Sequence, residues 1–268
     1  MSKILRWLAD QSFKFISQHR IGKFYPVKAI WNLLFNRISL PLKSNIAAFE
    51  TKCITKQIVE GNVVLDIGAR VGYYTLIFSR LVGKEGKVFA FEPDPKNFAL
   101  LQKNVQAKGC RNVVLIRKAV ANKTGQANLY LSEHHQGDHR IYDSSDGRQS
   151  IKIESIRLDD FLKGYNHRIN FIKIDVQGAE AGVIQGMARL LEENKELRIA
   201  TEFWPLGLQQ SGVKPEDFLR LFLDRGFLMH QIDEEKQSLQ QIKISELLQR
   251  YTAEEDNQTD LLFTRCQR

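Results

Sequence analysis

The sequence predicts a doubly wound α/β domain with a mostly parallel sheet, and three observations carry this prediction. An apolar run over 62–66 passes through a turn with two glycines into a helix-like segment over 73–82. A second apolar run, over 87–91, ends at an acid, Glu92. From residue 61 onward, strand-like and helix-like segments alternate, which is typical of parallel strands with helices on both faces of a sheet.

Seven strands and four long helices are expected in the core, in a Rossmann-like order. The expected strands are 62–66, 87–91, 113–117, 170–175, 197–202, 227–232 and 260–265. The expected helices are 73–82, 95–108, 179–193 and 214–225. The last helix has Pro215 near its first turn, where proline is well tolerated. No long helix is evident between 232 and 242, so an antiparallel strand is expected at this edge of the sheet.

A piece over 126–158 interrupts the alternation between the third and fourth core strands. Its two strand-like runs, 127–131 and 150–156, predict an inserted β-hairpin. The polar loop between them carries His134, His135, His139 and Asp138. These side chains could ligate a metal, but adjacent histidines on a loop point in different directions. A solvated loop and substrate recognition are the other interpretations, and we prefer no metal there.

Residues 1–60 form a basic, aromatic-rich extension ahead of the domain over 61–268. This stretch carries ten basic and three acidic side chains, within a chain of net charge +8. Pro26 and Pro41 should divide it into short helices. A helical lid on the domain is the preferred interpretation. Contact with an anionic membrane surface and binding of nucleic acid are the alternatives.

Composition limits the cellular setting. The chain has 268 residues, of which 43% are hydrophobic, so it can bury one sizeable core plus an extension. Its three cysteines lie far apart, which argues against a disulfide framework or a zinc site. No apolar run approaches the roughly 18 residues of a membrane span, and charges interrupt the N-terminus. We therefore expect a cytoplasmic protein, with peripheral membrane contact left open by the basic extension.

The turn after the first strand predicts an adenosyl cofactor. Its pattern is D-x-G-x-x-x-G, from Asp66 through Gly68 to Gly72, whereas dinucleotide sites use G-x-G-x-x-G. A carboxylate at Asp66 would repel a pyrophosphate but attract an ammonium, by about 4 kcal/mol at 4 Å and an effective dielectric near 20. Glu92 would accept hydrogen bonds from ribose hydroxyls. These features favour S-adenosylmethionine over NAD, and an ordinary connection without a ligand is the alternative.

Three motifs, in order, resemble the FkbM family of class I methyltransferases. They are Val64 to Thr75, Phe91 to Pro95, and Ile169 to Gly186, the last preceded by Leu158–Asp159–Asp160–Phe161. The resemblance implies S-adenosylmethionine-dependent, metal-independent O-methylation of a hydroxyl on a sugar, glycan or polyketide-like small molecule. The residues that we assign to the cofactor are Asp66, Gly68, Ala69, Gly72, Tyr73, Thr75, Glu92, Pro93 and Ala119.

Two positions depart from the family pattern. The family usually has Asn where this chain has Arg70, and Glu where it has Gln177. Arg70 could pair with the methionine carboxylate or repel the sulfonium, and Gln177 keeps a hydrogen-bonding amide without a charge. These departures motivate the alternative of a non-catalytic adenosyl-binding scaffold. RNA methylation is a weaker alternative, supported only by the basic charge.

The acceptor is expected beyond the ends of the fourth and fifth core strands. Asp175 and Glu202 end these strands, and ligands bind outside the carboxyl ends of strands in open α/β sheets. Asp175, Glu202 and His139 are the candidate catalytic bases for direct in-line methyl transfer. Arg140 and Trp204 are the candidate substrate contacts. The two carboxylates would also suit Mg²⁺, but a third ligand is missing, so a sugar or small-molecule acceptor without metal is preferred.

Overall fold

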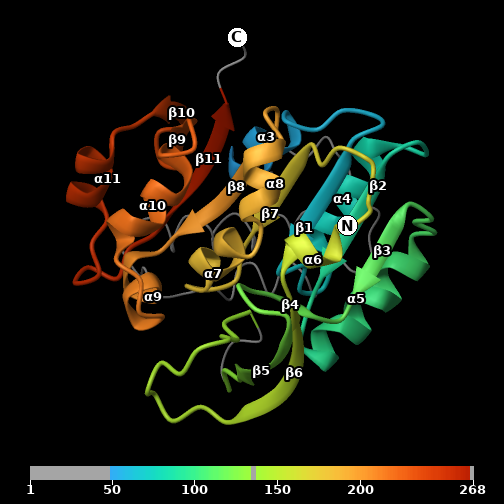
Figure 1. The fold of residues 1–268 in the computed structure, drawn as a ribbon, viewed down its shortest axis with the longest axis horizontal. Helices are drawn as coiled ribbons and strands as arrows, with labels where there is room; N and C mark the ends of the chain where they lie inside the picture. Colours follow the sequence, from blue (N-terminus) through green and yellow to red (C-terminus); the bar gives the residue numbers. More distant parts are fainter. Residues whose placement is uncertain (1–48, 134–136, 266–268) are drawn as a thin grey trace, which may run out of the picture. The chain divides into compact units, whose positions relative to one another are not determined.

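The computed structural model describes residues 49–133 and 137–265 (Figure 1). Most of the predicted basic extension, up to residue 48, lies outside the described residues. Its expected roles as a lid, a membrane contact or a nucleic-acid contact therefore stay predictions. Its described part, 49–60, begins with the short helix α3 (Phe49–Thr55). No helix within the described ranges is long and apolar enough to cross a membrane.

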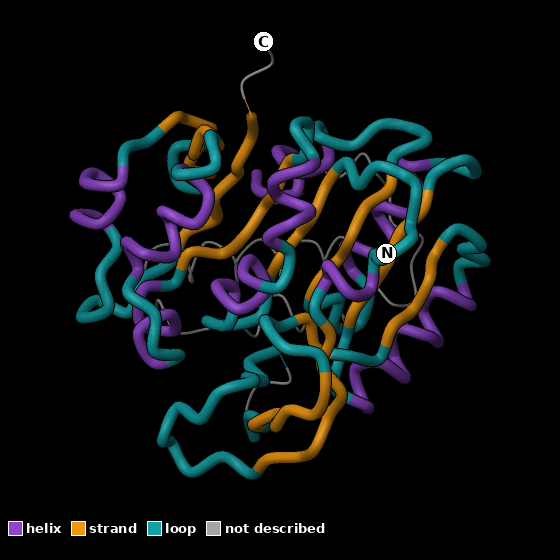
Figure 2. Tube along the Cα trace, in the orientation of Figure 1, coloured by secondary structure: helices purple, strands orange, loops and turns teal. Residues whose placement is uncertain are grey.

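The main sheet has eight strands rather than the seven expected (Figures 1 and 2). Its order is β10-β9-β11-β8-β7-β1-β2-β3. The strands are β1 (Val63–Ile67), β2 (Lys87–Phe91), β3 (Val113–Ile116), β7 (Phe171–Ile174), β8 (Arg198–Phe203), β9 (Phe227–Asp233), β10 (Ser238–Gln241) and β11 (Thr259–Arg265). The five strands from β8 to β3 pair in parallel, whereas β11 is antiparallel to both β8 and β9. The prediction of a mostly parallel sheet with an antiparallel element at one side is confirmed.

The eighth strand, β10, was not predicted. It pairs antiparallel with β9 at the edge of the sheet, and most of its side chains are exposed. A strand that buries neither face needs no alternation of apolar residues. Its Ser-Leu-Gln-Gln sequence therefore carries no strand signal.

Helices cover both faces of the sheet (Figure 1). They are α4 (Tyr73–Val82), α5 (Pro95–Ala107), α6 (Leu158–Phe161), α7 (Glu180–Gln185), α8 (Ala188–Glu193), α9 (Pro205–Gln210), α10 (Pro215–Leu223) and α11 (Ile244–Arg250). The single helix expected over 179–193 is wrong, because it is divided into α7 and α8 at Gly186. A Cβ on Gly186 would lie 2.1 Å from the carbonyl oxygen of Ala121, so the backbones touch where the helix breaks.

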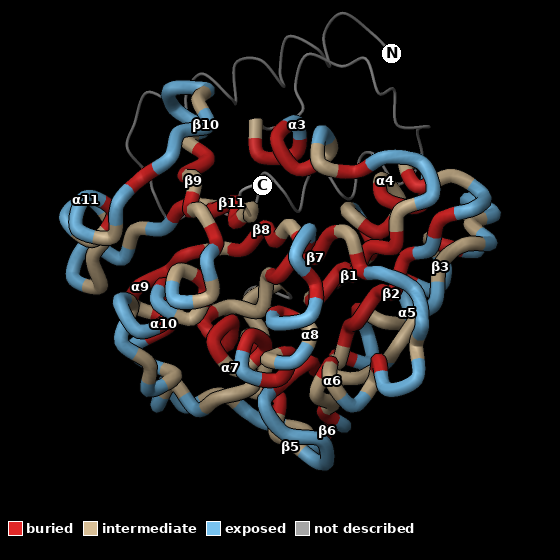
Figure 3. Tube along the Cα trace, turned by 45° about the horizontal axis from the view of Figure 1, so that its top comes forward, coloured by how far each residue is buried: buried red, intermediate tan, exposed pale blue. Residues whose placement is uncertain are grey.

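Buried residues follow the central strands of the sheet (Figure 3), and their apolar side chains form two main clusters, one on each face. In β1, Leu65 and Ile67 belong to the larger cluster, whereas Val64 belongs to the smaller cluster with Phe78 and Phe171. Because side chains alternate along a strand, Asp66 points to the face of the smaller cluster. The parallel register places Lys173 of β7 beside it.

The inserted hairpin belongs to a second, three-stranded sheet of order β4-β6-β5. Strands β5 (Gly125–Tyr130) and β6 (Ser150–Ile156) pair antiparallel, as expected from their sequences. The two-residue strand β4 (Ala119–Val120) adds to β6 in parallel and was too short to predict.

Candidate functional site

The turn between β1 and α4 is held against the end of β2. The amides of Gly68 and Ala69 both donate to the carbonyl of Phe91, at 3.0 and 2.9 Å. Gly68 has φ +82°, and a Cβ there would lie 2.0 Å from the carbonyl oxygen of Asp175. A glycine is therefore required at this position. The same contact brings the predicted cofactor turn against the predicted acceptor strand end.

Asp66 lies beneath this turn, with its side chain almost fully buried. Its carboxylate accepts a hydrogen bond of 2.5 Å from the hydroxyl of Thr75, in the first turn of α4. Burial raises the pKa of Asp66, and the neighbouring Lys173 opposes that rise. Asp66 thus joins the strand to the helix from inside, and its contact with a cofactor ammonium stays a prediction.

Glu92 closes the other side of the turn. Its carboxylate oxygens accept from the amides of Arg70 and Asp94, at 2.8 and 2.9 Å. Burial raises the pKa of Glu92 to about 7. Two carboxylate oxygens offer about four lone-pair sites, so acceptor capacity is left for a ribose. These features fit the adenosyl cofactor expected from the sequence.

The other predicted cofactor residues surround these two acids. Ala69 is buried in the turn, and Gly72, with φ +96°, is the N-cap of α4. Tyr73 is the first residue of α4 and is partly exposed. Pro93 follows Glu92 directly. Ala119 lies farther along the chain, in β4, three residues beyond the carbonyl of Ile116 that accepts from the amide of Glu92.

The carboxylates at the ends of β7 and β8 are brought together, as predicted. The side-chain amide of Gln177 donates to Asp175 at 2.9 Å and to Glu202 at 3.2 Å. Gln258 donates to the other oxygen of Glu202 at 2.8 Å. Gln177, one of the two departures from the family pattern, therefore acts as a neutral bridge between two acids.

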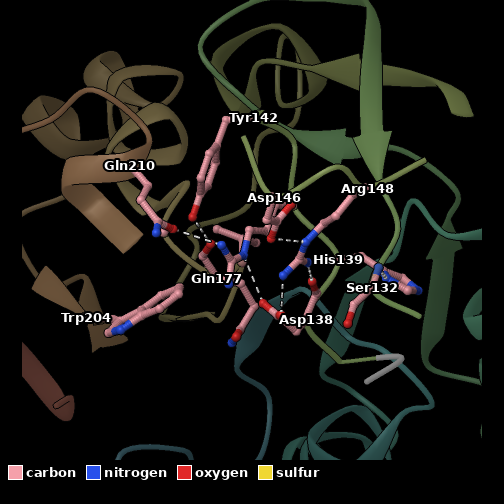
Figure 4. Close-up of polar contacts among 12 residues, drawn as sticks. Ser132, Asp138, His139, Tyr142, Asp146, Arg148, Gln177, Trp204 and Gln210 are labelled. Atoms are coloured by element: carbon pink, nitrogen blue, oxygen red, sulfur yellow. Dashed lines mark hydrogen bonds and ion pairs between the residues drawn. The ribbon is translucent and has the colours of Figure 1, made fainter. Parts of the chain in front are cut away.

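The predicted substrate contacts also meet. The guanidinium of Arg140 lies 4.9 Å from the ring of Trp204, and its Nε donates to Asp138 at 2.9 Å. Its Nη1 donates to Gln210 at 2.8 Å. The Tyr142 hydroxyl donates to the carbonyl of Gln177, so this cluster joins the loop that carries Asp175 (Figure 4). Because Arg140 is buried and already engaged, an anionic acceptor would have to share its remaining N–H groups.

The hydrogen bond of His139 goes to the hairpin backbone and not to either predicted acceptor carboxylate. Its Nδ1 accepts from the amide of Ser132 at 3.0 Å (Figure 4). Burial lowers the pKa of His139, and the charges that act on it belong to Asp94, Asp138 and two arginines, including Arg70. The imidazole is thus neutral near pH 7 and lies toward the cofactor turn. Its role as a catalytic base stays a prediction.

No three His, Cys, Asp or Glu side chains in the described part of the chain are placed to hold one metal ion. His134 and His135, which suggested a metal site in the polar loop, lie outside the described residues.

Two features of the site were missed by sequence reasoning. Lys173 lies on a strand whose other residues are apolar, and its ammonium is 3.0 Å from Asp175. A buried lysine within such a run is the signal that could have found it. The guanidinium of Arg70 packs on Gly137 of the hairpin loop, where a Cβ would lie 2.6 Å from its Cζ. Nothing local in the sequence indicates that contact.

Comparison with known proteins identifies a family. The profile of the methyltransferase FkbM domain matches residues 66–229. The hexuronic acid methyltransferase AglP of Haloferax volcanii is 27% identical over 173 residues, which cover 63% of this chain and 65% of AglP. The 2-O-methyltransferase NoeI of Sinorhizobium fredii is 30% identical over 150 residues, covering 50% of this chain and 60% of NoeI. A solved FkbM methyltransferase from Methylobacillus flagellatus is 15% identical, with a TM-score of 0.46 and coverage of 77% of this chain and 44% of that chain. The chain thus spans less than two thirds of the length of each of these three proteins.

Proposed function

Because the chain belongs to the FkbM methyltransferase family, we propose that it is an S-adenosylmethionine-dependent O-methyltransferase. Its acceptor is a hydroxyl of a sugar, glycan or polyketide-like small molecule. When bound, S-adenosylmethionine supplies a methyl group activated by a sulfonium. The observation that carries the proposal is the pair of carboxylates, Asp175 and Glu202, bridged by Gln177 directly beside the glycine turn. The named activities of AglP on a hexuronic acid and of NoeI at a 2-O position support a sugar hydroxyl.

In the proposed mechanism, one residue of the site accepts a proton and the others position that residue and the acceptor. Asp175 accepts the proton of the acceptor hydroxyl, because its side chain is 37% exposed and an acceptor can reach it. The side chain of Lys173, its ion-pair partner, is only 5% exposed. Gln177 orients Asp175 from one side. Trp204 is buried under the guanidinium of Arg140, so it supports that arginine, and stacking of a sugar on its ring would require Arg140 to move. Alignment of the hydroxyl oxygen with the methyl carbon is then the main contribution of the protein.

The test is methyl transfer to a panel of acceptors. We expect transfer from labelled S-adenosylmethionine to at least one member of a panel of hexuronic acids, neutral hexoses and phenolic small molecules. Asp175→Asn should lower kcat by about 100-fold or more, the usual contribution of a general base. The dissociation constant of this variant for S-adenosylhomocysteine should stay within about threefold of the wild-type value. The reason is that Asp175 is proposed to contact the acceptor and not the cofactor.

The control is Asp233→Asn, which removes a partly buried carboxylate paired with Lys236 at the end of β9 and should leave transfer unchanged. If Asp175→Asn and Glu92→Ala weaken cofactor binding equally, Asp175 belongs to the cofactor site. If S-adenosylhomocysteine binds but no acceptor is methylated, the chain is better described as a non-catalytic adenosyl-binding protein.

A further inference from the structure

The buried Lys173 makes contacts that the proposed reaction does not use directly. Its ammonium lies 3.0 Å from Oδ2 of Asp175 and 4.7 Å from the centre of the Tyr74 ring. Its strand register places it beside Asp66. The other oxygen of Asp175, Oδ1, accepts from Gln177. Asp175 is therefore held at both oxygens, from inside the fold by a cation and from the surface by an amide.

We propose that Lys173 is a positioning residue, which keeps the carboxylate of Asp175 ionised and fixed in one orientation at the end of β7. This inference rests on the proposed function, in which Asp175 accepts the proton of the acceptor hydroxyl. Lys173 touches neither acceptor nor cofactor in this role. It acts through Asp175 alone.

Three carboxylates and one aromatic ring, from different elements of the fold, surround the ammonium of Lys173. Asp175 directly follows its strand, Asp66 faces it from β1, Glu50 from α3, and the ring of Tyr74 from α4. Burial by itself lowers the pKa of Lys173, but these three acids raise the pKa above its usual value. The lysine is thus charged at all physiological pH values. Three carboxylates converge on this one ammonium, so its removal would leave negative charges facing one another.

Asp175 has a second acid close by in addition to Glu202. The charge of Asp175 is among the causes that raise the pKa of the buried Glu180 on α7. Repulsion among neighbouring acids favours the protonated form of a carboxyl group. A protonated Asp175 could not accept a proton, and Lys173 opposes this loss.

Packing alone does not call for a lysine at this position. A buried ion pair can often be replaced by apolar side chains of similar size without loss of stability. A methionine would fill the same space between Tyr74 and Asp66 at lower desolvation cost. The lysine side chain is nearly closed to solvent whereas Asp175 is open on its outer side, as expected if the cation serves the carboxylate.

The experiment is a double-mutant cycle on the full chain with Lys173→Met, Asp175→Asn and the combined variant. The first readout is the urea midpoint at pH 7.5, which needs no substrate. We expect Lys173→Met to lower the midpoint and the combined variant to restore it in part, above that of Lys173→Met, because Asp175→Asn removes one of the carboxylates that Lys173→Met leaves without a cation. The matched control is Lys236→Met, which removes an exposed ammonium paired with the carboxylate of Asp233 and should leave the midpoint unchanged.

The second readout is the pH profile of kcat. In Lys173→Met the acidic limb should move upward by about one pH unit or more, because loss of an adjacent cation favours the protonated carboxyl. Additive midpoint changes, or a combined variant that fails to fold, would overturn the proposal and leave a packing role. Non-additive urea midpoints together with an unchanged acidic limb of the kcat profile would also overturn it. In that case Lys173 and Asp175 would form a purely structural ion pair. If the wild type methylates no acceptor, the proposed function fails, and the urea cycle alone decides whether Lys173 holds Asp175 as an anion.

Discussion

Lowering the pH from 8 to 6 should weaken cofactor binding about tenfold, through Glu92. Burial raises the pKa of this carboxyl to about 7 in the cofactor-free protein. In the proposed site, ribose hydroxyls would donate to the ionised form of Glu92, so below pH 7 a proton would have to leave before the ligand binds. Each pH unit below the pKa costs about 1.4 kcal/mol. The dissociation constant for S-adenosylhomocysteine should therefore be nearly flat above pH 7 and rise about tenfold per unit below it.

The assay is calorimetric titration with S-adenosylhomocysteine at pH 6, 7 and 8, in two buffers that differ in ionisation enthalpy. The difference between the binding enthalpies in the two buffers gives the number of protons released on binding. We expect close to one proton at pH 6 and almost none at pH 8. Glu92→Gln should bind more weakly at pH 8 and lose the pH dependence. Glu180→Gln is the matched control, because burial also raises the pKa of Glu180 to about 7 but Glu180 faces the β7 loop. A wild-type affinity that changes less than threefold, or a tenfold change that persists in Glu92→Gln, would refute the reasoning.

Three further outcomes are expected. Gly68→Ala should cost about 1–3 kcal/mol in strain plus the clash with Asp175, whereas Gly61→Ala, at a similar φ of +83° with no atom within 4 Å, should cost the strain alone. Comparison of the unfolding midpoints of the two variants separates the backbone strain from the clash. Equal decreases in midpoint would contradict the close approach of Gly68 to the carbonyl oxygen of Asp175. Glu180→Gln should stabilise the protein by up to about 3 kcal/mol at pH 8. The sign follows from the raised pKa of Glu180 in the folded state. The ionised form is costly to bury, so the wild type loses stability as the pH rises from about 4.5 to 7. The stability gained by Glu180→Gln should therefore vanish near pH 4 in denaturant titrations. Arg140→Lys removes the planar fork that serves two partners, so the KM for the acceptor should rise several-fold while cofactor affinity is kept. An unchanged KM would exclude Arg140 from the acceptor site.

The cofactor turn could be predicted from the sequence because its parts are close together along the chain. Asp66, Gly68 and Gly72 lie within one strand–turn–helix unit, where spacing alone sets the geometry. The convergence of Asp175 and Glu202 was also predictable. In a parallel sheet the carboxyl ends of neighbouring strands lie at one edge, and β7 and β8 are neighbours.

Contacts that depend on backbone conformation in loops could not be predicted. Arg70 and Gln177, the two departures from the family pattern, have φ of +53° and +56°. Residues other than glycine rarely adopt this left-handed region, so the directions of their side chains do not follow from periodicity. From there Arg70 reaches the hairpin loop and Gln177 bridges two carboxylates. Lys173 was missed for another reason, since its neighbours on the strand are apolar and the run is typical of a buried strand without charge.

The placement of β11 bears on how the protein is made. This seven-residue strand follows β9 and β10 in the chain but lies inside the sheet, between β8 and β9. A ribosome that adds about 5–20 residues per second needs about 3 to 11 seconds to pass from the end of β8 to the start of β11. During that time the outer edge of β8 lacks its native partner and is a template for pairing with other nascent chains. The order of synthesis therefore leaves an inner edge of the sheet open until nearly the whole chain has been made.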